Sequence, residues 1–580
     1  MNMNNQSIWR PDKQEVVVEN GAVASAHPIA SRVGIDILQD GGNAVDAAIA
    51  TGFCLNVVEP WSSCIAGHGQ MLVYMSDLGK TLSLDYSHRS PMDASANMYQ
   101  VLGQVETGNG LYEVESQANS VGHSSVGVPG VSAGMWKAHE LFGSLPMEQL
   151  MEPSIHYARE GFDVDWTACL MIAQAMPDLI RYSEGGRIFL PGGYPPTPGE
   201  KLVQSDLADV LTRISKEGRD ALYKGDIAHA IEEEMKLNGG FLNAKDLAAF
   251  EVEVSEPLQT SYKGYDVLSS PVPSGAFTQL QALNILSYFD IDKLRHNSDG
   301  YVHLIVEVLR HAFADRYRFL GDPDFGPVPL KGMLSKDYAR EIAGMIDREN
   351  AEMESETNLQ PWVSFADKIV HNPWDYENNN GLDPIGSMSP PSAGDSTTHF
   401  SVIDKSRNMV SCTQTATAGF GARVVVPGTG ILLTNGMVVF NPKDGTPNSI
   451  AGNKRGLNNM GAVLVLNGGK PFFALGASGG RKIMSRLVQV ILNVIDFGNG
   501  IQEAITAPTV DAADRETFAD HRLDTKMIEA LSRMGHRMEI VPEPSTGGGF
   551  AKPRGVMLNE KTGLVHAGVH VIGPDGAYGY

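Results

Sequence analysis

The sequence predicts a layered protein that combines helices and sheets, of the α/β or α+β class. Apolar residues recur at helical spacing through most of positions 130–350, whereas alternating, strand-like segments begin abruptly near position 397. Hydrophobic residues make up 42% of the 580 residues and charged residues 19%, a balance typical of globular proteins with a sizeable core. The length suits one large domain or a few ordinary ones.

The composition restricts the classes of partner. With 45 Lys and Arg against 68 Asp and Glu, the formal net charge of −23 argues against nucleic acid or an anionic membrane as the main partner. No apolar run approaches the roughly 20 residues that span a bilayer. Residues 1–19 lack the apolar core of a signal peptide, so we expect a cytoplasmic protein.

Metal and disulfide chemistry are not predicted. The four cysteines are scattered and form no CxxC pair, and the sixteen histidines form no ligand motif such as HExxH. We therefore expect four buried free thiols and no metal site, although an even number of cysteines also permits disulfides.

The first 60 residues predict a strand and two helices. Residues 21–26 read as a short buried strand, and His27-Pro28 as the start of a helix that Gly41-Gly42 ends. Asn43 is a suitable N-cap for a second helix over residues 44–58. This helix is apolar nearly all round, so we expect it to be buried.

Further along, residues 72–76 and 81–86 predict a hairpin, and residues 299–320 predict a long amphipathic helix. Residues 361–396, by contrast, are rich in Asn, Ser, Pro and Gly and predict an unstructured connection. A connection of this length inside a compact domain usually has a function or is a linker.

A second hairpin follows this connection directly. Residues 399–403 and 409–415 are strand-like and flank a turn cluster. If Ser406 is the centre of the turn, Thr397 lies opposite Thr415. The register is inferred, and a slip of one residue would undo this pairing.

Thr397 is a candidate nucleophile at the end of the connection. A threonine hydroxyl is a weak nucleophile, but its own free α-amino group can activate it as a general base. That amine, with a reference pKa of about 7.7–8.0, exists only after the peptide bond between Ser396 and Thr397 is cut. Ordinary strand propensity also explains threonines at this point. We interpret His399, which follows on the strand, as structural.

A glycine-rich turn is the second chemical feature. Residues 471–475 predict a strand, residues 476–480 read Gly-Ala-Ser-Gly-Gly, and a helix is expected over residues 481–497. Free N–H groups at a helix start, together with glycines that allow close approach, suit an oxyanion hole. A tight strand-to-helix turn is the alternative interpretation.

Several motifs together resemble the γ-glutamyltransferase family along nearly the whole chain. They are Gly41-Gly42-Asn43-Ala44-Val45-Asp46-Ala47-Ala48, Val126-Gly127-Val128-Pro129-Gly130, Ala312-Phe313-Ala314-Asp315-Arg316, Thr397-Thr398-His399-Phe400-Ser401-Val402, Thr413-Gln414-Thr415, Gly428-Thr429-Gly430-Ile431-Leu432-Leu433 and the final Gly579-Tyr580.

The resemblance implies an α+β fold, a four-layer αββα sandwich of the N-terminal nucleophile hydrolase type. It also implies a zymogen that cuts itself into a large subunit, 1–396, and a small catalytic subunit, 397–580, which stay associated as one structural domain. By matched position, Thr397 is the nucleophile and Thr415 the threonine that supports it. Gly479 and Gly480 supply the oxyanion donors. No metal or organic cofactor is expected.

The sequence departs from the family pattern where a γ-glutamyl group would bind. The family's carboxylate-binding arginine is replaced by Ser87, with Arg89 two residues further on, and the acid that holds the α-amino group is replaced by Val439. The remaining candidate substrate-binding positions differ as well, and are Thr417, Asn458 and Asn459. A valine cannot hold an ammonium group, so recognition of a free α-amino acid end is weakened.

These observations lead to one main hypothesis and two alternatives. The main hypothesis is a self-cleaving amidohydrolase or acyltransferase that acts on a small amide without a free α-amino acid end, as relatives acting on oxamate or glutaryl amides do. The first alternative is a true γ-glutamyltransferase or glutathione hydrolase that uses Arg89 and the asparagines. The second is a non-catalytic scaffold with the same fold.

Overall fold

The computed structural model describes residues 12–104, 112–352, 372–377, 396–543 and 548–580. Most of the predicted connection over residues 361–396 therefore lies outside the described residues. Its described parts are Ser396 and residues 372–377, which contain the short 3-10 helix η5 (Pro373–Tyr376).

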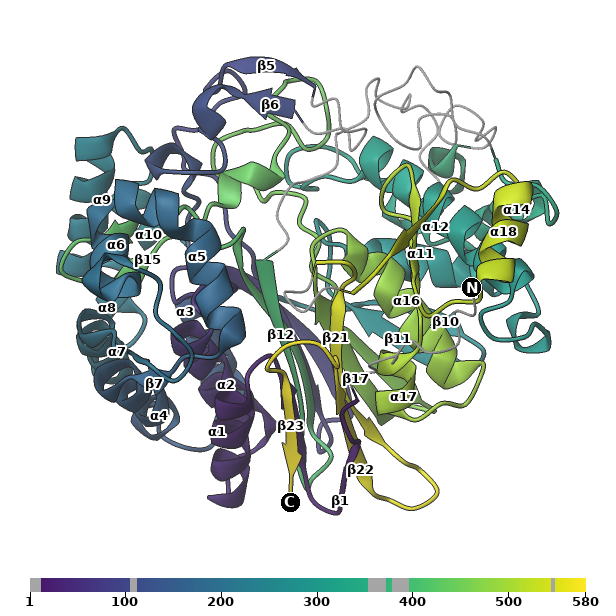
Figure 1. The fold of residues 1–580 in the computed structure, drawn as a ribbon, viewed down its shortest axis with the longest axis horizontal. Helices are drawn as coiled ribbons and strands as arrows, with labels where there is room; N and C mark the ends of the chain where they lie inside the picture. Colours follow the sequence, from purple (N-terminus) through teal and green to yellow (C-terminus); the bar gives the residue numbers. More distant parts are fainter. Residues whose placement is uncertain (1–11, 105–111, 353–371, 378–395, 544–547) are drawn as a thin grey trace, which may run out of the picture.

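Within the described residues, two seven-stranded sheets form the centre of the molecule (Figure 1). The first sheet has the order β1 (Val16–Val18), β22 (Val565–Val569), β21 (Lys552–Leu558), β17 (Lys470–Ser478), β16 (Val463–Asn467), β11 (Tyr265–Ser269) and β10 (Leu258–Tyr262). The second has the order β23 (Gly576–Gly579), β2 (Ala22–Ser25), β12 (Ser396–Ile403), β13 (Met409–Thr417), β3 (His68–Met75), β4 (Lys80–Tyr86) and β9 (Glu253–Ser255).

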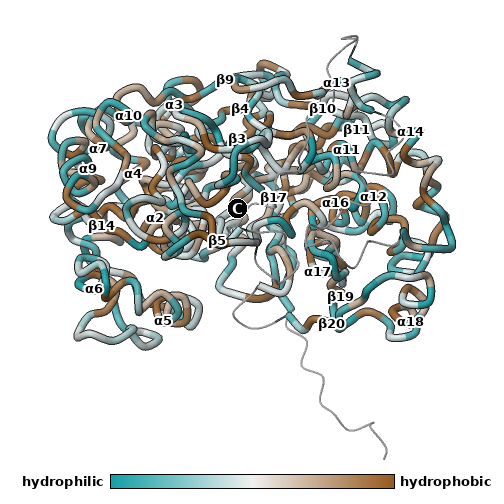
Figure 2. The backbone as a smooth tube through the Cα atoms, turned by 90° about the horizontal axis from the view of Figure 1, so that it is seen from above, coloured by the Kyte–Doolittle hydropathy of each residue, from teal (hydrophilic) through white to brown (hydrophobic). Residues whose placement is uncertain are grey.

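Helices cover the outer face of each sheet. The second sheet contacts α2 (Ala44–Val58) and α3 (Val131–Phe142), and the first contacts α11 (Ala276–Leu286) and α16 (Lys482–Ile495). Figure 2, viewed from above, shows these two helical groups on opposite sides of the strands. The layers therefore run helix, sheet, sheet, helix, which is the αββα sandwich that the family resemblance implies.

The remaining helices extend these two outer layers. On the side of the second sheet they are α1 (Pro28–Gln39), α4 (Met147–Glu160), α5 (Trp166–Arg181), α6 (Ser183–Phe189), α7 (Ser205–Glu217), α8 (Asp220–Tyr223), α9 (Gly225–Asn238) and α10 (Ala244–Ala248). On the side of the first sheet they are α12 (Asp299–Phe319), α13 (Leu330–Met333), α14 (Lys336–Met345), α17 (Ile501–Thr506) and α18 (Thr525–Arg533).

The sheets pack face to face through a shared apolar layer. It includes Leu72, Ile403, Leu464 and Val556, one from each of four strands, and each is fully buried. On the outer side, every residue of α2 is buried, as its all-round apolar sequence predicts. Asn43 caps α2 through a capping box with Asp46, which satisfies the free N–H groups of its first turn.

The segment over residues 130–350 is mostly helical, as predicted, but not throughout. Strands β9, β10 and β11 interrupt it between positions 253 and 269. Strand β11 pairs with β16, almost 200 residues later in the chain. Because the segment carries only short alternation and its partner is distant, local periodicity could not identify it.

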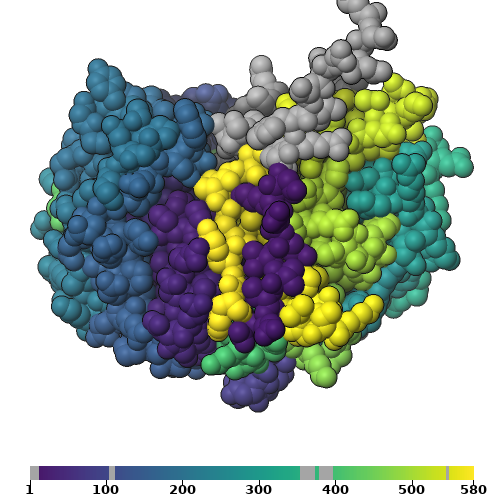
Figure 3. Space-filling view, turned by 60° about the horizontal axis from the view of Figure 1, so that its bottom comes forward, coloured from purple at the N-terminus to yellow at the C-terminus, as the bar shows by residue number. Residues whose placement is uncertain are grey.

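Both sheets combine early and late parts of the chain. Strand β1 pairs with β22, and β2 lies between β23 and β12. Figure 3 shows the N-terminal strands (purple) and C-terminal strands (yellow) side by side on one face. The segments before and after position 396 are therefore joined by continuous sheet hydrogen bonding.

The expectation about the cysteines is confirmed. All four cysteines are free and buried. Within the part of the chain that the structure describes, no helix has both the length and the apolar character needed to cross a bilayer.

Candidate active site

The candidate nucleophile lies in a bulge of the β12–β13 hairpin. The predicted register holds up to the pair Thr398 and Gln414, but it then shifts, and Ser396 pairs with Thr417. Thr397 therefore has no ladder partner of its own, which corrects the predicted direct pairing with Thr415. Thr417 adopts φ +84°, which is unusual for a β-branched residue. Such bulges often direct a side chain at a functional site.

The bulge brings three hydroxyl and carbonyl groups into one chain of hydrogen bonds. The Thr397 hydroxyl donates to Thr415 Oγ1 at 3.3 Å. The Thr415 hydroxyl in turn donates to the carbonyl oxygen of Ser396. The backbone N–H of Thr417 donates to Thr415 Oγ1 at 2.8 Å, which fixes the orientation of this hydroxyl. Thr415 thus links the candidate nucleophile to the carbonyl of the peptide bond that precedes it.

His399 supports the hairpin and does not face the nucleophile. Its ring nitrogens lie 2.9 Å from Thr413 Oγ1 and 2.9 Å from Ser401 Oγ. Burial holds the pKa of His399 well below its usual value, so the ring is neutral. A Cβ on Gly476 would lie 2.2 Å from this ring, which explains a glycine where β17 crosses it. The structural interpretation of His399 agrees with this geometry.

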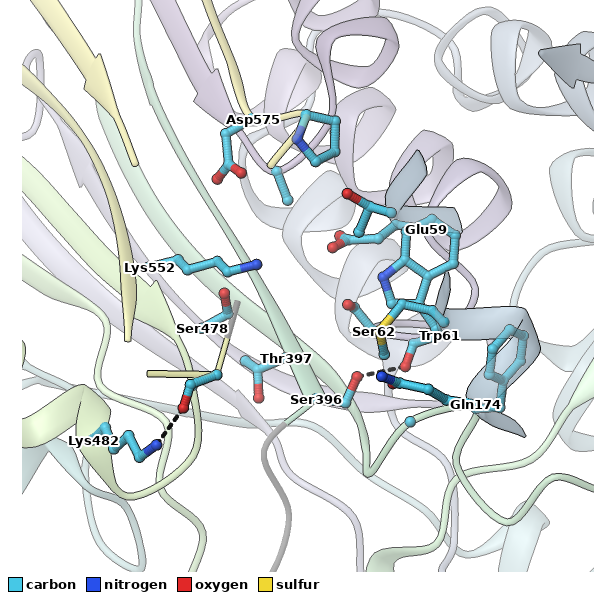
Figure 4. Close-up of a pocket in the computed structure, with 18 of the residues that line it drawn as sticks. Glu59, Trp61, Ser62, Gln174, Ser396, Thr397, Ser478, Lys482, Lys552 and Asp575 are labelled. Carbon is cyan, nitrogen blue, oxygen red and sulfur yellow. Dashed lines mark hydrogen bonds between the residues drawn. The ribbon is translucent and has the colours of Figure 1, made fainter. Parts of the chain in front are cut away.

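A cavity of about 600 Å³ opens beside Thr397 (Figure 4). We call it the Thr397 cavity. Its wall includes residues after α2 (Glu59, Trp61, Ser62), residues of α5 (Thr167, Met171, Gln174), the end of β17 with the turn that follows (Ser478, Gly479), the start of α16 (Arg481, Lys482), and β21 with the C-terminal loop (Lys552, Arg554, Asp575). This volume is within the range of small-molecule sites.

The glycine turn borders this cavity. Strand β17 extends through Ser478, further than predicted, and α16 begins at Lys482. Gly479 and Gly480 form the turn with φ +135° and +60°. A Cβ on Gly479 would meet the Cα of Ala551 at 2.7 Å, so both backbone conformation and space require glycine here. Gly479 lines the Thr397 cavity.

Several charges in the cavity wall are already paired. Arg554 is bound to Asp575 and donates to Ser478 Oγ at 3.0 Å, and Arg481 lies 2.9 Å from Asp514. Glu59 is buried, and this burial raises its pKa to about 7, although Arg554 and nearby hydroxyls oppose the shift. Glu59 therefore changes its charge near neutral pH.

None of the predicted substrate-binding residues lines the Thr397 cavity. Asn458 donates to Ser87 Oγ at 3.3 Å, and Asn459 Oδ1 accepts from Arg316 at 3.2 Å. The Arg89 guanidinium donates to Glu253 at 2.5 Å and to the carbonyl of Asn453. The Arg89 guanidinium is therefore already engaged by other groups of the protein.

Thr417 and Val439 are the remaining positions at which the sequence departs from the family pattern. Thr417 Oγ1 lies 2.9 Å from His68 Nε2, and the His68 ring packs edge-on against His88 with centroids 4.3 Å apart. Burial lowers the pKa of His88 to about 3, so it is neutral. Val439 packs in an apolar cluster with Phe440. The position where the family has an acid is thus filled by apolar contacts.

Sequence reasoning missed Arg455, which organises a buried network. Its guanidinium lies 2.6 Å from Asp322, 3.0 Å from Asp324 and 3.8 Å from Asp85, and it also binds Glu253. These partners are distant in sequence, so no local pattern could connect them. The cavity residues Glu59, Lys482, Lys552 and Arg554 were missed for the same reason.

One group among the described residues has the composition of a metal site. His303, Glu307 and His536 are buried, with potential ligand atoms within 4.8 Å of one another. However, His303 Nδ1 and His536 Nε2 are 2.7 Å apart, a direct hydrogen bond, and Arg310 lies 3.8 Å from Glu307. None of the three lines the Thr397 cavity.

Comparisons with known proteins identify the family of the chain. The family model described as Gamma-glutamyltranspeptidase matches residues 30–569. A glutathione hydrolase proenzyme from Pseudomonas sp. (strain A14) is 37% identical over 514 residues, covering 87% of this chain and 83% of the relative. The acylase ACY 1 proenzyme from Pseudomonas sp. (strain SE83) is 36% identical over 542 residues, covering 93% and 90%. Among solved structures, cephalosporin acylase from Bacillus halodurans matches with a TM-score of 0.84 and 26% identity, covering 100% and 99%.

Proposed function

Because the chain belongs to the gamma-glutamyltranspeptidase family, we propose that it is a proenzyme that cuts its own Ser396–Thr397 bond. The product is an amide hydrolase or acyltransferase with Thr397 as N-terminal nucleophile. Relatives named as glutathione hydrolase and acylase proenzymes support this reaction class.

One observation carries the proposal: the hydrogen-bonded chain from the Thr397 hydroxyl through Thr415 to the Ser396 carbonyl. The Thr415 hydroxyl, which donates to this carbonyl oxygen, lies where negative charge develops when the carbonyl carbon is attacked. The chain ends at a cavity of about 600 Å³, so the same hydroxyl has access to an external substrate after the cut.

The self-cleavage step follows from this arrangement. Thr397 Oγ attacks the carbonyl carbon of Ser396, its proton passes to Thr415, and the Thr415 proton passes to the forming oxyanion. The C–N bond then breaks, the Thr397 nitrogen takes the proton, and an ester joins Ser396 to Thr397 Oγ. Water hydrolyses this ester and leaves a Ser396 carboxylate and a free Thr397 amine.

In the cut enzyme the free amine serves as general base for the Thr397 hydroxyl. The hydroxyl attacks a substrate amide, the amine component leaves, and the acyl group stays on Thr397 Oγ. Backbone N–H groups at Gly479 and Gly480 stabilise the tetrahedral oxyanion. Water or an acceptor amine then releases the acyl group.

The two products, 1–396 and 397–580, are expected to remain associated. Strand β12 of the small part pairs with β2 of the large part, and β13 pairs with β3. Cutting one peptide bond at the end of β12 leaves these ladders and the apolar layer between the sheets in place.

The acyl group is proposed to differ from a γ-glutamyl group. Ser87, in place of an arginine, accepts a hydrogen bond from Asn458, and Val439 packs against apolar neighbours. A zwitterionic amino acid end would find neither a guanidinium nor a carboxylate from these two positions. The proposal of a small amide without a free α-amino group rests on these two departures from the family pattern.

The intact mass of the purified protein, beside a Thr397→Ala control, tests the proposal. We expect two species that divide at 396/397, absent from the control. A single uncut chain in both would refute the nucleophile assignment and favour a non-catalytic scaffold. Rapid hydrolysis of a γ-glutamyl anilide by the cut enzyme would refute the altered acyl specificity and favour a true γ-glutamyltransferase.

A further inference from the structure

We propose that the substrate amide carries a carboxylate and that Lys552 and Lys482, in the wall of the Thr397 cavity, bind it. This inference rests on the proposed function, because it names the substrate class of the same site. It depends on the placement of the two lysines and on the pairing of every other cation in the cavity wall.

The two lysines flank the proposed oxyanion turn. Lys552 lies across the β17–β21 ladder from Ser478, the residue before Gly479. Lys482 is the first residue of α16, two positions after Gly480. Figure 4 shows their side chains on either side of Thr397. Both lysines line the same cavity as Thr397 and Gly479, so a substrate in this cavity has access to both ammonium groups.

The other cations of the cavity wall have acidic partners. Arg554 is bound to Asp575, Arg481 to Asp514, and Arg423 to Asp178. Each of these pairs compensates its own charge, so none of the three arginines adds an uncompensated charge to the cavity.

Lys552 and Lys482 differ in this respect. Among the described residues, neither ammonium group has a carboxylate within 4.0 Å. Lys482 Nζ donates to the carbonyl of Gly548 at 2.5 Å and lies 5.8 Å from the centre of the Phe518 ring. Glu543 interacts electrostatically with Lys552 but forms no ion pair with it, and Glu543 also lies 3.9 Å from His570.

Two uncompensated cations inside a chain of net charge −23 form a local positive site. A lysine ammonium is a compact charge with three donors, which suits a carboxylate. Glu59, also in the wall, is only partly ionised near neutral pH because burial raises its pKa to about 7. Its charge therefore does not neutralise both lysines.

The test compares substrates that differ only in charge. Glutaryl 4-nitroanilide and its neutral analogue with a terminal carboxamide place the charge in the acyl part. N-butyryl-4-aminobenzoate and N-butyryl-4-aminobenzamide place it in the amine part. We expect kcat/KM of the wild-type enzyme to favour the charged member of one pair at least about tenfold, and this ratio to fall at least about tenfold in Lys552→Met or Lys482→Met.

Lys470→Met is the matched control, because Lys470 is an exposed lysine at the opposite end of the same strand β17, and it should keep the wild-type ratio. Equal rates on charged and neutral members by the wild-type enzyme would overturn the inference. An unchanged ratio in both cavity-lysine variants would overturn it as well.

Binding separates a failure of this inference from a failure of the proposed function. Full-length Thr397→Ala protein, titrated calorimetrically with glutarate and with 4-acetamidobenzoate, should bind one of them. Adding Lys552→Met should weaken that binding at least about tenfold. Anion binding without self-cleavage or hydrolysis would refute the proposed function alone, whereas absence of binding to either anion would refute the lysine site.

Discussion

Replacing Thr415 with valine removes the hydroxyl that the proposed self-cleavage requires and so tests its role. Valine keeps the shape of threonine but removes one donor and one acceptor. The variant loses the hydrogen bond to the Ser396 carbonyl and the acceptor of the Thr397 hydroxyl at 3.3 Å. It also leaves the buried N–H of Thr417 without its acceptor at 2.8 Å.

These lost contacts give the expected magnitude. A single donor to a developing oxyanion contributes about 10²–10³ in rate, or about 3–4 kcal/mol of barrier. The orphaned N–H of Thr417 costs about 1–3 kcal/mol of stability. We therefore expect Thr415→Val to fold with a lower Tm and to cleave at least about 100-fold more slowly than the wild-type chain.

A time course of intact mass on freshly purified precursor measures this rate, with Thr397→Ala as the uncut reference. Thr415→Ser is the matched control, because it keeps the hydroxyl and loses only a methyl group, so it should cleave within about tenfold of the wild type. Wild-type cleavage by a folded Thr415→Val would refute the role of this hydroxyl.

Three further predictions follow from other parts of the structure. In Gly479→Ala the new Cβ meets the Cα of Ala551 at 2.7 Å. This variant should still self-cleave through Thr415 but lose at least about 100-fold in the rate of amide hydrolysis. Parallel loss of both activities would contradict separate oxyanion donors for the two reactions. Arg455→Met leaves the buried carboxylate of Asp322 without its cationic partner and should lower the free energy of unfolding by about 3–5 kcal/mol. Arg89→Met should lower it by less than about 1 kcal/mol. Denaturant unfolding measures both values. Burial raises the pKa of Asp315 from 3.8 to about 7, so the folded protein keeps a proton that the unfolded chain releases. The contribution of Asp315 to stability therefore falls by about 4 kcal/mol as pH rises from about 4 to 7. Asp315→Asn should remove this part of the pH dependence, and a pH profile of Tm identical to that of the wild type would contradict the raised pKa.

The N-terminal elements were predictable from the sequence because their signals are local. Asn43 caps α2 as predicted, and the structure adds a capping box with Asp46. Helix α12 over Asp299–Phe319 follows its apolar period almost to the residue. The hairpin β12–β13 was located from alternation and a turn cluster, and its register was correct as far as Thr398 and Gln414.

The bulge at Thr397 was not predictable. It depends on Thr417 adopting φ +84°, which no propensity favours and which is held by a contact with His68 from another strand. Alternation alone assumes an unbroken ladder, so it placed Thr397 directly opposite Thr415. The contact between their hydroxyls exists, but through the bulge.

The sequence by itself determined the family, the mixture of layers and the candidate nucleophile, because these depend on residue types at fixed short spacing. Only the tertiary structure decided the composition of the Thr397 cavity. Glu59, Gln174, Lys482, Lys552 and Asp575 come from five separate segments, and their proximity is set by the packing of two sheets and α5. The same packing paired Arg89 with Glu253 and placed Lys552 in the same cavity wall as Thr397, since a charge finds its partner through distance in space and not along the chain.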